Sequence, residues 1–124
     1  MRIRKRDAGE LVRRVKEFVS NDANVRVRLP EISHAVGASP SHLAATFKRA
    51  ERTTIHRYLV NLRLSRAASL LAGCDDMTVL ALNLGFASHS HFSNAFRRWA
   101  GCTPGMYRAR LRAGISRPGA ELTA

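Results

Sequence analysis

The sequence has 124 residues, enough for one ordinary domain or two very small ones. It carries 21 lysine and arginine residues against 9 acidic residues, a formal net charge of +12, and 45% of its residues are hydrophobic. This composition excludes a disordered chain and favours a folded protein with a polyanionic partner, because arginine, whose fork pairs with phosphate and guanine, dominates the cations.

Apolar periodicity predicts seven helices in an all-α fold, since no segment alternates convincingly with the two-residue period of a strand. The first helix is expected over 7–21, with apolar residues recurring every three or four positions. A short second helix starts near Pro30, where proline suits the first turn, and stops at Gly37. Ser39 then caps a third helix, with Pro40 at its first position.

The fourth predicted helix is the longest and covers about 55–72, with Leu70 among its buried residues. At 1.5 Å per residue it spans roughly 27 Å. Asp76 is a good cap for a fifth helix over 78–84.

The last predicted elements are a sixth helix over 89–99, with Trp99 facing inward, and a short seventh helix that ends near residue 110. The expected domain over 8–110 is flanked by a basic arm, 1–7, and a flexible tail, 111–124.

The sequence repeats itself at an offset of about 48 residues. Each copy contains a short helix, a glycine turn, a serine cap and a second helix that ends in two basic residues. This is the layout of a helix-turn-helix unit, in which the second helix reads the major groove. The repeat therefore predicts two such units, the first over about 29–50 and the second over about 77–99, with one extra residue in the second turn.

Both units offer groups that bind the DNA backbone. The predicted phosphate contacts are the two capping serines and the basic pairs, namely Ser39, Lys48, Arg49, Ser88, Arg97 and Arg98. Major grooves on one side of a duplex lie about 34 Å apart, so the helix over 55–72 is expected to set the two second helices at about that spacing. Both halves of the chain are basic, which favours a footprint along the whole molecule.

Several short sequence motifs lie along residues 8–110. They are Gly37-Ala-Ser-Pro-Ser-His-Leu43, Phe47-Lys48, Tyr58-Leu59, Leu62-Arg63-Leu64, Gly85-Phe86, His91-Phe92-Ser93, Phe96-Arg97, and Thr103-Pro104 followed by Tyr107-Arg108. With these motifs the chain resembles the DNA-binding domain of AraC/XylS-type transcription regulators. The resemblance implies a seven-helix fold of two joined units and control of transcription at promoters, often as an activator that contacts RNA polymerase.

The resemblance also implies which side chains read bases. They fall on Ser41, Ala44 and Ala45 in the first unit and on His89, Ser90 and Asn94 in the second. Alanine has no hydrogen-bonding side chain but can touch a thymine methyl, so the first unit is expected to contribute mainly phosphate binding and shape. Asn94 is expected to pair with adenine, and His89 is expected to donate or accept a hydrogen bond at a base edge. The alternative for His89 and Ser90 is that they cap the start of the helix and face solvent.

Arg28 departs from the family pattern, whereas Arg63 resembles a position that the family keeps for internal structure. Arg28 stands where many relatives have a serine or threonine cap, and arginine cannot accept from backbone amides. Arg63 is expected to pack and form ion pairs inside the protein and not to contact DNA.

Most members of the family carry an effector or dimerisation domain ahead of this one. Two interpretations stay open: a stand-alone regulator that works as a monomer, or a fragment or degenerate copy with mainly non-specific DNA binding. Nothing in the sequence indicates a small-molecule pocket or a membrane span, and the basic N-terminus lacks a signal-peptide pattern, so we expect a cytoplasmic, nucleoid-associated protein.

Other classes of protein fit less well. His89 and His91 lie two apart on a helix and point about 200° away from each other, so they make a poor metal pair. No nucleophile–base motif accompanies them, and we expect no enzyme activity, metal or cofactor. Cys74 and Cys102 form no C-x-x-C pattern; Cys74 in an exposed turn would suit a redox sensor, although an inert thiol is favoured.

Overall fold

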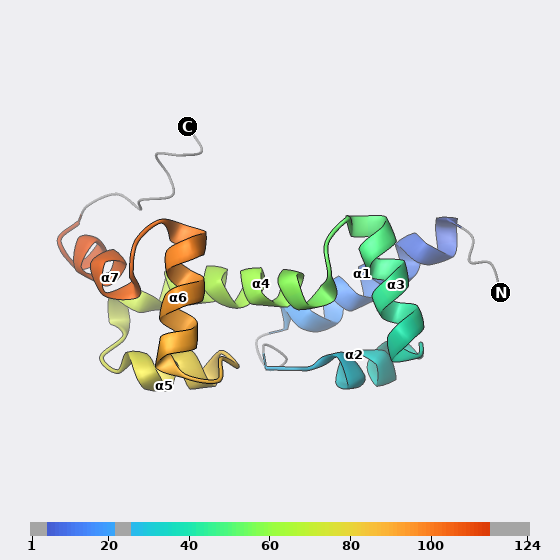
Figure 1. The fold of residues 1–124 in the computed structure, drawn as a ribbon, viewed down its shortest axis with the longest axis horizontal. Coiled ribbons are helices and arrows are strands. Elements are labelled where there is room, and N and C mark those ends of the chain that lie inside the picture. The colour runs from blue at the N-terminus through green and yellow to red at the C-terminus, as the bar shows by residue number, and fades with distance from the viewer. Residues whose placement is uncertain (1–4, 22–25, 115–124) are drawn as a thin grey trace. The chain divides into compact units, whose positions relative to one another are not determined.

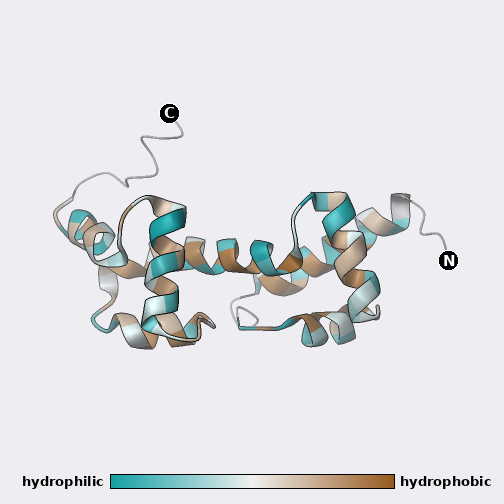
Figure 2. Ribbon diagram, viewed as in Figure 1, coloured by the Kyte–Doolittle hydropathy of each residue, from teal (hydrophilic) through white to brown (hydrophobic). Residues whose placement is uncertain are grey.

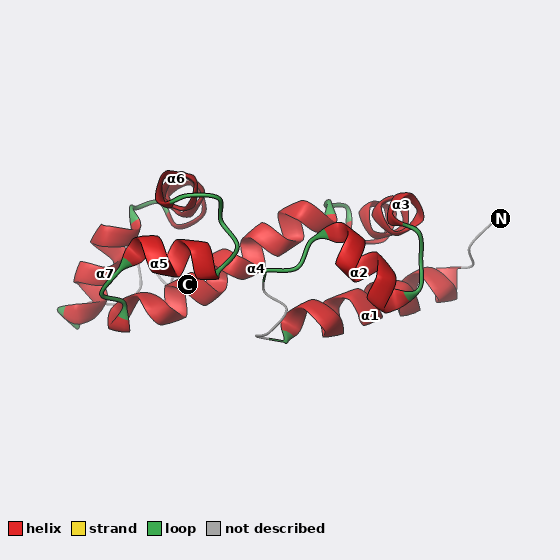
Figure 3. Ribbon diagram, turned by 90° about the horizontal axis from the view of Figure 1, so that it is seen from below, coloured by secondary structure: helices red, strands yellow, loops and turns green. Residues whose placement is uncertain are grey.

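The computed structural model describes residues 5–21 and 26–114, and within them it contains helices and loops but no strand (Figure 3). Seven α-helices and one short 3₁₀ turn follow one another along these residues. They are α1 (Lys5–Ser20), α2 (Leu29–Val36), α3 (Pro40–Glu51), α4 (Ile55–Leu70), η2 (Leu71–Gly73), α5 (Met77–Asn83), α6 (His89–Ala100) and α7 (Pro104–Arg112). The all-α prediction and the order of its elements are confirmed.

Helix ends differ from the predicted ends by a few residues. α1 begins at Lys5, inside the predicted basic arm, and α7 continues to Arg112. α4 ends at Leu70 because the chain tightens into η2, where the Cys74 N–H donates to the Leu71 carbonyl at 3.1 Å. The rest of the predicted arm and tail, residues 1–4 and 115–124, and the loop residues 22–25 lie outside the described residues.

The chain divides into two units, residues 1–60 and 61–124, and each has its own core. In the first unit α1, α2 and α3 pack together, drawn from blue to green in Figure 1. Leu43 and Phe47, four residues apart on α3, are fully buried, as are Val15 of α1 and Ile32 of α2. Burial of each large apolar side chain contributes about 1.5–3 kcal/mol, so this pair fixes which side of α3 faces the core.

Aromatic rings form the core of the second unit around α6. Phe92 and Phe96 are fully buried, with ring centroids 5.7 Å apart. Phe86, from the turn before α6, lies 5.3 Å from Phe92, and Tyr107 of α7 lies 5.3 Å from Phe96 in an edge-to-face contact. These contacts hold one side of α6 against the unit and leave the opposite side exposed.

Two predictions of burial are wrong. Trp99 is 42% exposed, because it lies at the margin of the aromatic cluster and contacts the Phe96 ring at 5.6 Å. Leu70 is 51% exposed, since it is the last residue of α4 and the chain turns there into η2. Arg63, by contrast, is buried as expected.

Lys16 connects α1 to α3 and to the start of α4. Its ammonium forms an ion pair with Glu51 at the end of α3 and lies 5.8 Å from the centroid of the Tyr58 ring of α4. The hydrogen bond to Glu51 holds the pKa of Lys16 above its usual value. The Tyr58 ring also meets the Phe47 ring edge-to-face at 5.5 Å, so the Lys16 ammonium lies at the edge of the apolar core.

Two arginines of α7 hold the turn before α5. Arg108 donates to the Cys74 carbonyl at 2.9 Å, and Arg112 donates to the Ala72 and Cys74 carbonyls at 3.0 and 2.8 Å. These bonds satisfy carbonyls at the end of η2 that no helix bond reaches. None of the helices within the described ranges is long and apolar enough to cross a membrane.

Candidate nucleic-acid interface

The two predicted helix-turn-helix units share one turn geometry. Gly37 and Gly85 adopt φ values of 72° and 93°, in the left-handed region that glycine enters without steric cost. The residue after each glycine donates its N–H back to the preceding helix: Ala38 to the Ser33 carbonyl at 3.1 Å, and Phe86 to the Ala81 carbonyl at 3.0 Å. The sequence repeat is therefore a structural repeat at its turns.

Different side chains support the two turns. In the first unit the buried Ser33 hydroxyl donates to the Ala38 carbonyl. The second unit has Ala81 at the position aligned with Ser33, and Phe86, the residue aligned with Ala38, is buried and packs edge-to-face against the His91 ring at 5.7 Å. A hydrogen bond fixes the first turn, and aromatic packing fixes the second.

Serine caps begin both second helices as predicted. Ser39 accepts from the His42 N–H at 3.3 Å, and Ser88 accepts from the His91 N–H at 3.0 Å. Each hydroxyl keeps its own proton for donation, so the predicted phosphate contacts of both serines stay compatible with capping.

The first helices of the two units are capped differently. Arg28 precedes α2 and makes no side-chain cap, whereas Asp76, aligned with it in the repeat, accepts from the N–H groups of Thr78 and Val79 at 3.0 and 3.2 Å. The expectation that Arg28 does not cap is confirmed.

The residues predicted to read bases lie on the outer sides of α3 and α6. Those on α6 (His89, Ser90 and Asn94) are all exposed. On α3, Ser41 and Ala45 are exposed, whereas Ala44 is half-buried because it lies beside the core face of the helix. In each helix the outer residues recur at four and three positions, which aligns Ser41, Ala45 and Lys48 on α3, and Ser90, Asn94 and Arg97 on α6.

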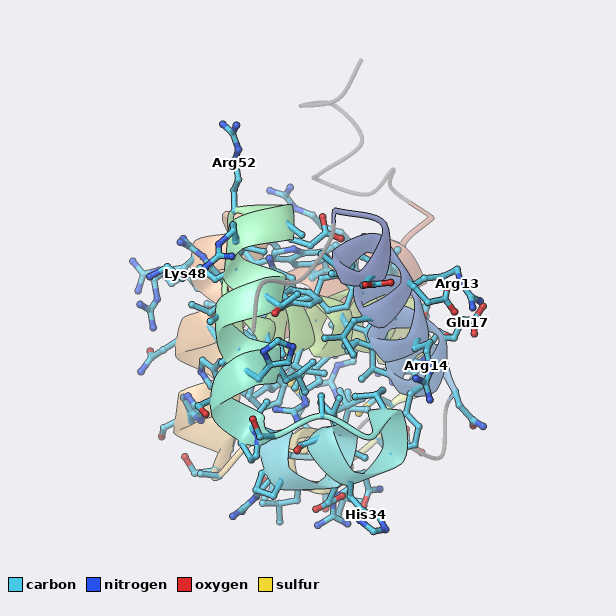
Figure 4. The ribbon with its side chains drawn as sticks, turned by 90° about the vertical axis from the view of Figure 1, so that its right-hand side faces the viewer. Arg13, Arg14, Glu17, His34, Lys48 and Arg52 are labelled. Atoms are coloured by element: carbon cyan, nitrogen blue, oxygen red, sulfur yellow. The ribbon has the colours of Figure 1, made fainter. Side chains whose placement is uncertain are left out.

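The cations of both second helices have no carboxylate partner within the described part of the chain. Lys48 and Arg49 end α3, Arg97 and Arg98 end α6, and all four are exposed. Figure 4 shows Lys48 on the side of α3 away from α1, and Figure 2 shows hydrophilic residues on the exposed side of α6. Cations without internal partners attract a polyanion.

The outer surface of α1 is different because its charges pair with one another. Arg13 donates to both Glu10 and Glu17, all three residues are exposed, and Figure 4 shows Arg13 and Glu17 on the outside of α1. The bond from Arg13 holds the pKa of Glu10 below its usual value. Internal pairing leaves little net charge on this surface, which makes it a poor candidate for phosphate binding.

Arg52 is a cation that the sequence reasoning missed. It ends α3 at a φ of 58°, a conformation that costs a non-glycine residue about 1–2 kcal/mol, and its N–H donates to the Lys48 carbonyl at 2.9 Å. The aligned residue of the second unit is Gly101, with a φ of 82°. Arg52 projects from the end of α3 on the exposed surface (Figure 4), and its alignment with a glycine was the available signal.

A shallow open hollow of about 450 Å³ lies beside α6 and is lined by Asn94, Arg97 and Arg98. The Arg98 Nε donates weakly to the Asn94 carbonyl at 3.5 Å. Among the described residues no three His, Cys, Asp or Glu side chains gather to hold a metal ion.

Two units, each a short helix, a tight turn and an exposed second helix ending in exposed cations, define a double helix-turn-helix protein. Comparison with known families agrees, because the helix-turn-helix domain family matches residues 32–110. The chain belongs to the AraC/XylS-type helix-turn-helix family.

Named relatives support this assignment. The chain is 40% identical over 85 residues, 68% of its length, to the RCS-specific HTH-type transcriptional activator RclR of Escherichia coli, and 37% identical over 72 residues, 57% of its length, to the transcriptional activator RhaR of Mannheimia succiniciproducens. It spans 29% and 26% of the length of these two relatives.

A solved structure agrees in fold. An AraC-type transcriptional regulator from Chromobacterium violaceum superposes with a TM-score of 0.72 at 28% identity, covering 86% of this chain and 96% of that one.

Proposed function

We propose that the protein is a sequence-specific, double-stranded DNA-binding transcription regulator that places α3 and α6 in adjacent major grooves of its promoter. The pair of exposed second-helix faces, each ending in cations without internal carboxylate partners, carries this proposal. The six base-reading side chains named from the sequence are the proposed base contacts. The proposed phosphate contacts are the groups named from the sequence, with Arg52 added and with Arg97 considered separately below.

The proposal extends to activation of transcription. RclR and RhaR, the two relatives reported above, are both named transcriptional activators. We therefore propose that the protein activates its promoter from the cytoplasm, with RNA polymerase as a further partner. Because one chain carries two recognition helices, it binds its DNA site as a monomer.

A second candidate function is mainly non-specific DNA binding, and one observation favours it. Ala44 and Ala45 give the first recognition helix no hydrogen-bonding group at two of its three proposed base contacts. A protein of that kind would bind every duplex through phosphates, with little preference between sequences.

A titration separates the two candidates. The purified protein is added to a labelled duplex from the DNA upstream of its own gene and to a scrambled duplex of equal length, and fluorescence anisotropy is read at two salt concentrations. A regulator should bind the native duplex about a thousandfold more tightly, and both affinities should fall with salt. If the native duplex and further promoter fragments all bind with the same affinity as the scrambled duplex, the result supports non-specific binding.

A further inference from the structure

Arg97 was expected to bind phosphate, as the first member of the basic pair that closes the second unit. Its position on α6 differs from that of the next arginine. Arg97 follows Asn94 by three residues and Ser90 by seven, which places all three on one outer side of the helix. Arg98 lies one position further round, and its Nε donates to the Asn94 carbonyl.

The hollow beside α6 brings Arg97 and Asn94 to one surface. Both residues line it, together with Arg98, and none of the described residues that line it is acidic. A long side chain on a helix leans toward the N-terminus, so the Arg97 guanidinium covers the turn that carries Asn94. The Arg97 side chain forms no hydrogen bond or ion pair with any other described residue, so its guanidinium is available to a ligand.

Spacing along the helix matches the spacing of bases. Residues three apart on an α-helix rise by about 4.5 Å, and successive bases of one DNA strand rise by about 3.4 Å. Asn94 and Arg97 therefore suit neighbouring base pairs when α6 lies along a groove. The asparagine amide pairs bidentately with the N6 and N7 atoms of adenine, and the arginine fork with the O6 and N7 atoms of guanine.

We propose that Arg97 is a specificity-determining residue that reads guanine beside the adenine read by Asn94, while Arg98 binds phosphate. This proposal rests on the proposed function. The second unit then recognises two adjacent purines, and the first unit, with Ala45 at the position of Asn94 and Lys48 at the position of Arg97, cannot read the same pair. The DNA site is asymmetric, with one purine step that dominates discrimination.

The test uses Arg97→Lys in the full chain, with Arg98→Lys as the matched control. Lysine keeps the positive charge but loses the planar fork, so it preserves a phosphate contact and weakens bidentate base pairing. Anisotropy titrations use the native duplex and a set of duplexes in which each base pair is replaced in turn.

The penalty at a base pair is the factor by which its replacement lowers the affinity for the duplex. In the unaltered protein, two neighbouring base pairs should show the largest penalties. Arg97→Lys should reduce the penalty at a G·C pair by about tenfold or more while affinity for unrelated DNA stays constant. Arg98→Lys should leave every penalty unchanged. Asn94→Ala should remove the penalty at the adjacent A·T pair.

Other outcomes overturn the proposal. If Arg97→Lys leaves every penalty unchanged, or lowers the affinity for all duplexes by one common factor, Arg97 binds phosphate. If the unaltered protein shows no preference for any duplex, the proposed function itself fails, which the first titration reveals separately. Circular dichroism of each variant confirms that α6 remains folded.

Discussion

Asn94 occupies the position on α6 that Ala45 occupies on α3, and both side chains are exposed. Only the asparagine amide can make two hydrogen bonds to one base edge. Asn94→Ala should therefore cost about 1–3 kcal/mol of discrimination at one base pair without changing the affinity for unrelated DNA. The measurement is an anisotropy titration with matched and mismatched duplexes.

The control for Asn94 is Ala44→Ser in the first unit. Ala44 is half-buried beside the core face of α3, so an added hydroxyl should alter base preference little. A loss of discrimination equal to that of Asn94→Ala would show that α3 reads bases as strongly as α6.

Lys16 offers a prediction about stability and pH. Lys16→Met should destabilise the protein by about 0.5–1 kcal/mol at neutral pH, because it removes a half-exposed ion pair with Glu51 and a cation over the Tyr58 ring. The pKa of Lys16 is raised by folding, so its contribution is complete below the pKa of the unfolded chain and disappears as pH rises through the folded pKa.

Urea titrations followed by circular dichroism at neutral and strongly alkaline pH provide the check. The difference between the original protein and Lys16→Met should shrink at the alkaline pH. A difference that stays constant with pH would mean that the aliphatic chain, and not the charge, stabilises the contact.

At the scale of the helix, the end of α3 is strained where the end of α6 is not. Arg52→Gly should raise the stability of the first unit by about 0.5–1 kcal/mol, because glycine adopts the positive φ without steric cost. The same change should weaken DNA binding and make its salt dependence shallower by about 0.9 in log–log slope, since one phosphate contact is lost.

Arg52→Lys is the matched variant, because it keeps both the charge and the strain. It should change neither stability nor salt slope appreciably. An Arg52→Gly protein that binds DNA as before, with the same salt slope, would exclude Arg52 from the interface.

Local signals explain how much of these helices could be predicted. Gly37, Gly85 and the two capping serines place the turns correctly, because a positive φ and a cap each require particular residue types. The end of α4 was predicted two residues late, since Leu71 and Ala72 favour a continued helix and the stop signal comes only at Gly73. The exposure of Trp99 depends on packing with Phe96, which periodicity alone does not specify.

The outer face of α6 was only partly predictable. The family pattern indicates Asn94 and its neighbours, but the bond from Arg98 to the Asn94 carbonyl, which distinguishes Arg98 from Arg97, depends on where two adjacent side chains lie in space. From the sequence alone, Arg97 and Arg98 are two adjacent basic residues with the same predicted role.

For the whole molecule, the net charge of +12 exceeds the number of cations proposed to touch phosphate. Four cations are proposed to contact phosphates, namely Lys48, Arg49, Arg52 and Arg98. They neutralise four phosphates and release the counterions bound there, so the logarithm of the affinity should fall against the logarithm of the salt concentration with a slope of about −3.6. Between 50 and 200 mM salt the affinity should drop roughly 150-fold. Titrations at four salt concentrations give the slope directly. A slope near zero would remove these cations from the interface, and one near −10 would require many more contacts.

Each core closes within its own half of the chain, and this has a consequence during synthesis. The aromatic cluster of α6 and α7 needs only residues after position 60, and the core of α1 to α3 only residues before it. Short-range closure of this kind is fast and does not wait for distant segments. On the ribosome, the first unit has every core residue it needs when the chain has been made to about residue 60, before any part of α6 exists. The first unit can therefore bury its apolar surface before α6 is made, which shortens the time for which that surface is exposed to aggregation or proteolysis.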